Sequence, residues 1–437
     1  MLILATLHKL RRRLSVNGGG DLQNQSDYWK SVAMLATGSS ASQLIGIVSM
    51  VMIARLYDPS EFGIFAVFTA YSGMLALVAT AKYDAAVFMA RRPREAADLT
   101  MLGIAISGIA GLFILLLTPA LTPLLVSETA QPTAFMVLMA VATASGGAMA
   151  AIMAWAMQVK AFKIVTQGRV AQSILVAVLG VGLGLLNWGA IGLIIALVAG
   201  QIIICAFLVW HLGFLVQARQ FRWRAARVRA LRNIRFPQYL LLSELLNFVG
   251  NNVISFVSPA LFGVAQLGQY NISQRVSAAP ITVIGTAMSG VFRSAVSPQH
   301  LSDKHHIRKL FRLTFVRLCA IGGGLTLPLL LAGPKIFEIL LGQKWSVAGH
   351  YVQILSPLIF IRFVASPLSA VLLLTNHQRL DAILQTLFVI AATMAVIAGA
   401  WTSSFLLMLI TLTILQTIIY CIYLVISYKL VMEMSPA

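Results

Sequence analysis

Charged side chains are scarce in this sequence. Of its 437 residues only 10% are charged, whereas ordinary soluble domains contain about 25%. Hydrophobic residues make up 59% of the chain, and the mean hydropathy is +0.88. Such a composition excludes an ordinary soluble globule and predicts an all-α polytopic membrane protein.

Several chemical signatures are also absent. The sequence contains no Gly-Lys dipeptide, which excludes a Walker A loop, and no pair of aspartates two residues apart, as glycosyltransferases use to bind a metal. The three cysteines, Cys205, Cys319 and Cys421, lie in apolar runs and indicate neither disulfides nor a metal site. We therefore expect no cofactor and no enzymatic activity.

Acidic residues are few as well. The 13 acids are outnumbered by 32 lysines and arginines, so the formal net charge is +19. In a soluble protein this excess would suggest nucleic acid as a partner, but in a membrane protein the position of each charge matters more. Placing the N-terminus in the cytoplasm puts most of the basic residues in cytoplasmic segments, so both termini are predicted to be cytoplasmic and no nucleic-acid partner is expected.

Apolar stretches of roughly 20 residues, long enough to cross the hydrocarbon core, predict twelve transmembrane helices. They are placed at 31–54, 62–88, 99–117, 133–156, 170–186, 190–215, 238–260, 268–292, 313–332, 350–375, 381–400 and 404–427. The short turn at Asn187 to Gly189 is the weakest of the divisions between these spans. The longest predicted outer loop, from Ala332 to Gly349, leaves no room for a folded domain outside the membrane.

An internal repeat divides the chain into halves. A shift of 205 residues aligns Ser49–Tyr71 with Ile254–Val276, although any two hydrophobic hairpins could align as well. The repeat predicts two six-helix lobes around a central cavity, the usual plan of secondary transporters. The predicted parts are a cytoplasmic tail at 1–28, lobes at 29–216 and 238–428, a basic cytoplasmic linker at 217–237 and a C-terminal tail at 429–437.

Polar residues form a stripe on each of two neighbouring predicted helices. Spacings of three or four residues place them on one helical face. The first stripe contains Glu244, Asn247, Asn251, Ser255 and Ser258, and the second contains Asn271, Arg275, Thr282, Thr286, Ser289 and Arg293. Because charge inside a bilayer is costly, such a stripe normally faces water or a partner. The two helices are predicted to form one wall of an aqueous cavity.

The turn after the first predicted span has the signature of a helix start. Asp58 can cap the next helix, Pro59 suits its first position, and Glu61 has the spacing of a capping box. Arg55 is predicted to form an ion pair with Asp58 or Glu61.

Three stretches carry a likeness to a known family. They are ARLYDPSEFGIFA at 54–66, LGQYNISQRVSAAP at 267–280 and LGQKWSVAGHYVQILSPLIFIRFVASPLSAVL at 341–372. The chain resembles the oligosaccharide flippases of the polysaccharide-transporter family, in the superfamily that also holds lipid II flippases and multidrug antiporters. The sequence departs from many relatives in having Lys82 where they have arginine, and an ammonium cannot make a bidentate phosphate contact.

The resemblance implies a function in the bacterial inner membrane. A lipid-linked oligosaccharide, carried on undecaprenyl pyrophosphate, would be turned from the cytoplasmic to the periplasmic leaflet during O-antigen, capsule or exopolysaccharide synthesis. The partners it implies are that substrate, membrane lipids and other membrane proteins of polysaccharide assembly.

Three cations inside predicted spans are candidates for binding an anionic headgroup. Arg275 would contact the anion, or it would pair with Glu244 and join two helices. Lys82 would line the cavity, or its long stem would carry the ammonium to the membrane surface. Arg362 lies between Pro357 and Pro367, which could kink the helix and open space around the guanidinium.

Amides and carboxylates complete the candidate site. Asn247, Asn251, Asn252 and Asn271 could bind sugar hydroxyls, but amides also hydrogen-bond helices to one another in membranes. A buried carboxyl can take up a proton on one side and release it on the other, so Asp84 and Glu244 are candidates for ion coupling. Their alternative use is to neutralise Lys82 and Arg275.

Two other functions remain open. A multidrug or cation antiporter would share the twelve helices but would favour acidic and aromatic pockets. A polytopic polysaccharide polymerase would be an enzyme and would need a large outer loop. For a flippase, alternating access by rocking of the two lobes is the predicted mechanism.

Overall fold

The described part of the chain is entirely helical. The computed structural model describes residues 41–90, 92–125, 131–214, 221, 223–278, 304–369 and 378–433. The helices of the N-terminal part are α3 (Pro59–Ala79), α4 (Tyr83–Phe88), α5 (Pro93–Leu125), α6 (Pro132–Gln158), α7 (Phe162–Leu185) and α8 (Gly189–His211). They are followed by α10 (Trp223–Arg232), the π-helical turn η1 (Phe236–Leu240), α11 (Leu241–Phe262), α13 (Lys304–Leu341), the 3-10 turn η3 (Gln343–Trp345), α14 (Ser346–Leu368), α16 (Gln378–Thr402) and α17 (Phe405–Glu433). Two further described helical stretches are 41–56 and 264–278.

Ten of the described helices are long and apolar enough to cross a membrane. The prediction of an all-helical, multi-pass membrane protein is therefore confirmed. The predicted spans 31–54 and 268–292 lie partly outside the described residues, so the count of twelve stays a prediction. The short division at Asn187 to Gly189 is confirmed, because α7 ends and α8 begins there.

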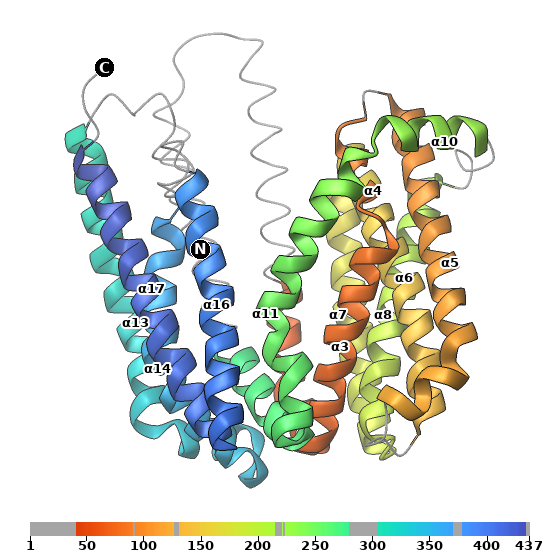
Figure 1. Ribbon diagram of the computed structural model, residues 1–437. Helices are drawn as coiled ribbons and strands as arrows, with labels where there is room; N and C mark the ends of the chain where they lie inside the picture. The colour runs from red at the N-terminus through yellow and green to blue at the C-terminus, as the bar shows by residue number, and fades with distance from the viewer. Residues whose placement is uncertain are drawn as a thin grey trace.

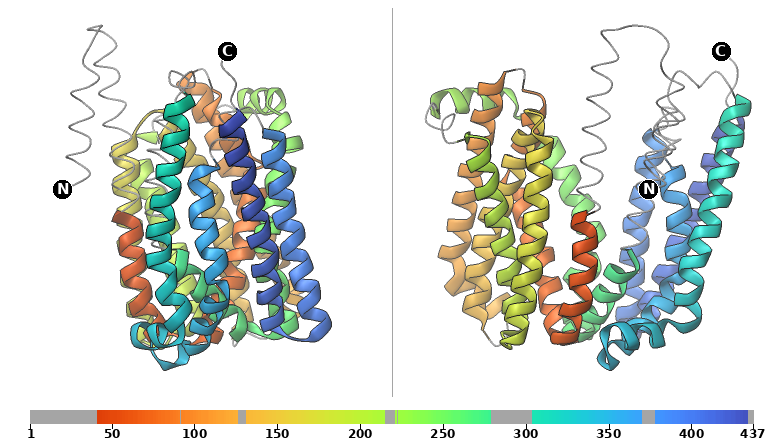
Figure 2. Two further views of the ribbon diagram at one scale, coloured as in Figure 1. Left: turned by 90° about the vertical axis from the view of Figure 1, so that its left-hand side faces the viewer. Right: turned by 180° about the vertical axis from the view of Figure 1, so that it is seen from behind.

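The helices pack in two groups (Figure 1). In the first group α5 packs against α6, α7 packs against α8, and α3 contacts both α6 and α8. In the second group α14 lies between α13 and α17, and α16 packs against α17. Helix α11 contacts α3 of the first group and α16 of the second. Figure 2 shows the same grouping from behind. The residue boundaries of the two lobes and the position of the termini stay predictions.

The predicted outer loop from Ala332 to Gly349 begins at a break in the structure, because α13 leaves helical geometry at Ala332, the last residue of the predicted span 313–332. A second helical segment then runs to Leu341, so the first part of the predicted loop is helical. Pro334 cannot donate a hydrogen bond to the Leu330 carbonyl oxygen, and Gln353 of α14 donates to that oxygen instead, at 3.0 Å. The side-chain hydrogen bond compensates for the missing backbone bond at this break, after which the chain is helical again.

Two glycines bring the predicted repeats into reciprocal contact. A Cβ atom on Gly63 would lie 1.8 Å from the Val264 carbonyl oxygen, and a Cβ atom on Gly268 would lie 1.8 Å from the Pro59 carbonyl oxygen. Residues 264 and 268 lie 205 positions after 59 and 63, the shift that aligns the repeat. A pair of reciprocal contacts is what a two-fold relation between the halves produces, so this crossing supports the repeat.

Side chains reinforce this crossing at one end of the bundle, the end where α3 begins. Following the orientation predicted from the charges, we call it the outer end and the opposite end the inner end. The Lys344 ammonium lies 3.0 Å from an Asp58 carboxylate oxygen. The Trp345 indole N–H donates to the Ala54 carbonyl oxygen at 2.6 Å. The outer end therefore joins elements almost 300 residues apart in the sequence.

The turn at Asp58 forms as predicted, except for Arg55. The capping box between Asp58 and Glu61 is present, with the Asp58 N–H donating to the Glu61 carboxylate at 2.7 Å. The predicted ion pair of Arg55 is wrong, because its guanidinium donates to the carbonyl oxygens of Leu340 and Ile339 at 3.0 and 2.9 Å. These carbonyls belong to the last turn of α13, where intrahelical donors are lacking and a cation is favoured.

The substitution Gly268→Ala tests the close crossing. Its Cβ would overlap a backbone oxygen that no side-chain rotation can move, and such overpacking costs about 1–3 kcal/mol. We expect a lower unfolding temperature of the purified protein, measured by intrinsic fluorescence in detergent. The matched control is Gly108→Ala in α5, where no atom lies within 4 Å of the added Cβ. Equal unfolding temperatures for the two variants would contradict the crossing.

Candidate functional site

The second predicted span is not one helix. Helix α3 stops at Ala79 and α4 starts at Tyr83, so the prediction of a continuous span at 62–88 is wrong. Between them Ala81 and Lys82 have φ angles of 45° and 58°, in the left-handed region. For residues with a side chain this conformation costs roughly 1–2 kcal/mol each. The apolar pattern does not reveal the break, because residues on both sides of it are equally apolar.

Two hydroxyl groups satisfy the backbone at this break. The Lys82 N–H donates to the Thr80 hydroxyl oxygen at 3.2 Å. The Ser107 hydroxyl of α5 lies 3.4 Å from the Ala79 carbonyl oxygen. Interrupted helices inside a membrane are tolerated where such groups replace the lost backbone bonds, and in transporters they often lie at binding sites.

Lys82 lies between two carboxylates. Its ammonium is 3.3 Å from Asp84 and 2.8 Å from Glu244 of α11, and only 11% of its side chain is exposed. Within the described structure the ammonium is therefore held by carboxylates, and whether it lies at the depth of the membrane surface stays a prediction. One cation with two carboxylates leaves the Lys82 cluster, defined as Lys82, Asp84 and Glu244, with a net charge of −1 when all three are ionised. One oxygen of Asp84 is buried without a hydrogen-bond partner among the described residues.

A polar pocket opens beside the Lys82 cluster. Glu244, Asn247 and Asn251 line it together with Leu77, Phe248 and Asn252. The first three residues of the predicted α11 stripe thus face one pocket, whereas Ser255 and Ser258 are buried in the packing.

The hydrogen bonds that the described structure gives the asparagines of this pocket lie within their own helix. Asn251 donates to the Asn247 carbonyl oxygen at 2.9 Å, and Asn252 donates to the Phe248 carbonyl oxygen at 2.9 Å. Among the hydrogen bonds of the described residues, none joins these amides to another helix. Their alternative role in joining helices finds no support among the described helices.

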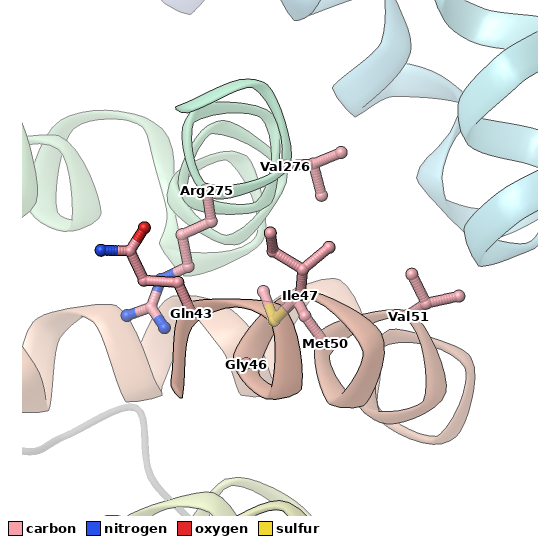
Figure 3. A pocket seen from close by; sticks show the side chains of 7 residues that line it. All are labelled: Gln43, Gly46, Ile47, Met50, Val51, Arg275 and Val276. Carbon is pink, nitrogen blue, oxygen red and sulfur yellow. The ribbon is translucent and has the colours of Figure 1, made fainter. Parts of the chain in front are cut away.

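Arg275 lies in a second pocket, between helix 264–278 and helix 41–56. The guanidinium carbon lies 5.3 Å from the centre of the Phe65 ring of α3, within cation–π range. Figure 3 shows the side chain extending toward helix 41–56, with its guanidinium beside Gln43. The pocket has a volume of about 200 Å³ and is lined by Gln43, Gly46, Ile47, Met50, Val51, Arg275 and Val276. Arg275 is exposed to this space and forms no ion pair with a described carboxylate, so its predicted alternative pairing with Glu244 is wrong.

Arg362 is also exposed and forms no ion pair within the described ranges. It lies on α14, close enough to the hydroxyl groups of Tyr270 and Tyr420 to interact with them electrostatically. Pro357 and Pro367 both lie inside α14, which continues unbroken from Ser346 to Leu368, so the kink expected between them stays a prediction. The exposure of Arg362 therefore does not depend on a broken helix.

Asn271 lies one helical turn before Arg275 on the same helix. Its side-chain carbonyl oxygen is buried and lacks a hydrogen-bond partner in the described structure. An unpaired buried acceptor costs free energy, so this amide is suited to accept a hydrogen bond from a bound group.

Sequence reasoning missed Gln43 and Tyr270. Gln43, Gly46 and Met50 recur at helical spacing in the first predicted span and line one face of the Arg275 pocket. That spacing was the signal that could have identified them. Tyr270 had no such signal, because its hydroxyl is placed near Arg362 by the packing of a distant helix.

Comparison with known proteins finds a matching family and similar membrane proteins. Residues 52–350 match the model of a family described as polysaccharide biosynthesis protein. A membrane protein from the cps region of Klebsiella pneumoniae is 23% identical over 164 residues, which are 36% of this chain and 33% of that protein. The lipopolysaccharide biosynthesis protein WzxC of Escherichia coli K12 is 23% identical over 145 residues, 32% of this chain and 28% of the relative. The chain thus aligns with about a third of the length of these curated relatives.

Solved structures extend the similarity to nearly the whole fold. The lipid II flippase MurJ in an inward closed conformation has a TM-score of 0.67 at 11% identity, covering 91% of this chain and 87% of that one. An inward-facing multidrug resistance MATE transporter of the MOP superfamily has a TM-score of 0.64 at 14% identity, covering 90% and 95%. At such low identity the likeness concerns the fold, which is that of MOP transporters.

A double-mutant cycle on Lys82→Gln and Glu244→Gln tests the ion pair across the two elements. Lys82→Gln leaves Glu244 without a cation, and Glu244→Gln leaves the 11%-exposed Lys82 side chain with Asp84 alone, so the stability losses of the two single variants should add up to more than the loss in the double variant. We expect a coupling free energy of about 1–3 kcal/mol from reversible unfolding in detergent. The control cycle pairs Lys82→Gln with Glu338→Gln at the outer end, and it should be additive. A coupling near zero for Lys82 and Glu244 would show that the pair does not form.

Proposed function

Because this chain belongs to the family of polysaccharide biosynthesis proteins, we propose that it flips an undecaprenyl-pyrophosphate-linked oligosaccharide from the cytoplasmic to the periplasmic leaflet of the bacterial inner membrane. The product would serve O-antigen, capsule or exopolysaccharide synthesis. The observation that carries the proposal is Arg275, an exposed cation without a described carboxylate partner in a pocket between two helices of the repeat.

The chemistry of the pocket fits the headgroup. A pyrophosphate is doubly acidic and cannot cross hydrocarbon unaided, whereas the prenyl tail need not leave it. A guanidinium binds a phosphate through two parallel hydrogen bonds, which is stronger than a single neutral bond. Phe65 beneath Arg275 holds the guanidinium without neutralising it. Arg362 is the second cation available to phosphates or acidic sugars, and Asn247, Asn251 and Asn271 supply amides for sugar hydroxyls.

Lys82 has a conditional role in this proposal. Two carboxylates hold its ammonium, so an anion must compete with them for it. Protonation of Glu244 would remove one competitor and free Lys82 for the headgroup. Asp84 and Glu244 would in this way couple proton uptake to substrate binding, and alternating access would carry the loaded site to the other side.

An antiporter of cationic compounds is the second candidate. The net charge of −1 on the Lys82 cluster, beside a pocket with three amides, favours a cation there. The two functions make opposite demands on Arg275, because a cationic substrate is repelled by it and an anionic one requires it.

Loss of Arg275 tests the flippase proposal. Vesicles containing the purified protein and a prenyl-pyrophosphate-linked disaccharide are assayed by a glycosidase that reaches only one leaflet. Charged hydrogen bonds contribute about 1.5–3 kcal/mol, so Arg275→Ala should slow translocation about 10- to 100-fold. Arg275→Lys should recover part of the rate, and the control Arg169→Ala, an exposed arginine of α7, should behave as wild type. No translocation by the wild type would exclude this function, and equal rates with Arg275→Ala would exclude Arg275 as its anion contact.

Neutralising Glu244 tests the coupling. The amide in Glu244→Gln cannot titrate, so translocation of the same probe should no longer respond to a pH difference across the vesicle membrane. The control Glu338→Gln removes a carboxyl at the outer end and should keep the wild-type response. An unchanged response in Glu244→Gln would show that the coupling proton binds elsewhere.

A further inference from the structure

Helix α10 lies across the ends of the spanning helices rather than along them (Figure 1). It belongs to the arginine-rich segment between α8 and α11, and four of its ten residues are arginines. It packs against α5 at the inner end of the bundle. A short, strongly basic helix lying parallel to the expected membrane plane has the geometry of an interfacial helix.

One face of α10 is fixed to the protein. Ala226 is fully buried, and Arg229 forms an ion pair with Asp98 of α5. The Tyr83 hydroxyl of α4 lies 3.4 Å from the Ala230 carbonyl oxygen. These contacts determine which side of the helix faces outward.

The outward face combines apolar and basic side chains. Trp223, Val228 and Leu231 are 57%, 67% and 58% exposed. Arg227 and Arg232 are exposed between them, and Arg235 continues the series beyond the helix. In water alone this face would leave large apolar side chains uncovered. At the boundary of headgroups and acyl chains the apolar groups enter the membrane, tryptophan is favoured, and the arginine stems reach back to the headgroups.

We infer that this face, defined by Trp223, Arg227, Val228, Leu231, Arg232 and Arg235, is a docking surface for anionic phospholipids of the inner leaflet. The cytoplasmic leaflet carries negative charge, which complements the three exposed arginines. An acidic protein could also pair with arginines, but the position of α10 at the ends of spanning helices places its apolar side chains at the level of the membrane surface. The membrane is therefore the occupant that satisfies both the charge and the apolar area.

A lipid bound to this face can affect the Lys82 cluster through Tyr83. Tyr83, which touches α10, directly follows Lys82 at the break between α3 and α4. A lipid that holds α10 in place therefore restrains the backbone that positions the Lys82 ammonium.

The test compares how strongly two lipids stabilise the purified full-length protein. The rise in unfolding temperature is measured as short-chain phosphatidylglycerol or phosphatidylcholine is added, because a ligand that binds the native state stabilises it. We expect phosphatidylglycerol to stabilise the wild type at a lower concentration than phosphatidylcholine does. A basic residue near an anionic surface contributes about 1 kcal/mol, or about fivefold in affinity. The triple variant Arg227→Gln, Arg232→Gln, Arg235→Gln should thus lose most of this preference, by about 100-fold.

Control variants distinguish lipid binding by this face from a general effect of basic charge on the protein. The variant Lys160→Gln, Lys163→Gln, Arg169→Gln removes three exposed charges near the α6–α7 turn and should keep the preference. Arg229 is left unchanged so that its ion pair with Asp98 still holds α10. Trp223→Ser with Leu231→Ser should weaken binding of both lipids, and inorganic phosphate alone should not stabilise the protein. Equal phosphatidylglycerol affinity in the wild type and the arginine triple variant, or equal losses in the triple variant and its control, would overturn the proposal.

Discussion

A charge inside a membrane span must be solvated by a partner or by water, and this constraint separates the intramembrane cations of the protein into two kinds. Lys82 is held by two carboxylates at a break between helices. Arg275 and Arg362 are exposed and have no carboxylate partner in the described parts of the chain, and Arg275 lines a pocket between two helices. Lys82 is therefore neutralised within the protein, whereas no described carboxylate neutralises Arg275 or Arg362.

The two ends of the bundle are stabilised differently. At the outer end, the backbones meet at Gly63 and Gly268. Lys344 and Trp345, in the turn between α13 and α14, add side-chain contacts to this crossing. At the inner end, the connection between the halves runs through Glu244 and through α10, which rests on α5 and α4. Backbone contact is rigid, while ion pairs can exchange partners. The contacts at the inner end can therefore rearrange when a charge is neutralised, whereas the backbone contact at the outer end cannot.

Much of the architecture could be predicted from the chain. Apolar length identified the membrane spans, the capping residues at Asp58 and Glu61 identified the start of α3, and the shift of 205 residues paired Gly63 with Gly268. Interruptions within the helices were harder to predict. The interruption at Ala81 and Lys82 was missed because a strained backbone has no signature in hydropathy. The break at Ala332 coincides with the end of the predicted span 313–332, but the helical segment after it was missed, because the hydrogen bond that replaces the Pro334 donor comes from Gln353 on another helix.

The sequence alone determined that the protein crosses the membrane as helices and that a few polar residues share helical faces, because both properties depend on neighbours within about two turns. Only the tertiary structure decided which charges meet. Glu244 could have paired with Arg275, 31 positions later, but it contacts Lys82, 162 positions earlier. Electrostatic pairing depends on distance in space, and the packing of α11 against α3 sets that distance.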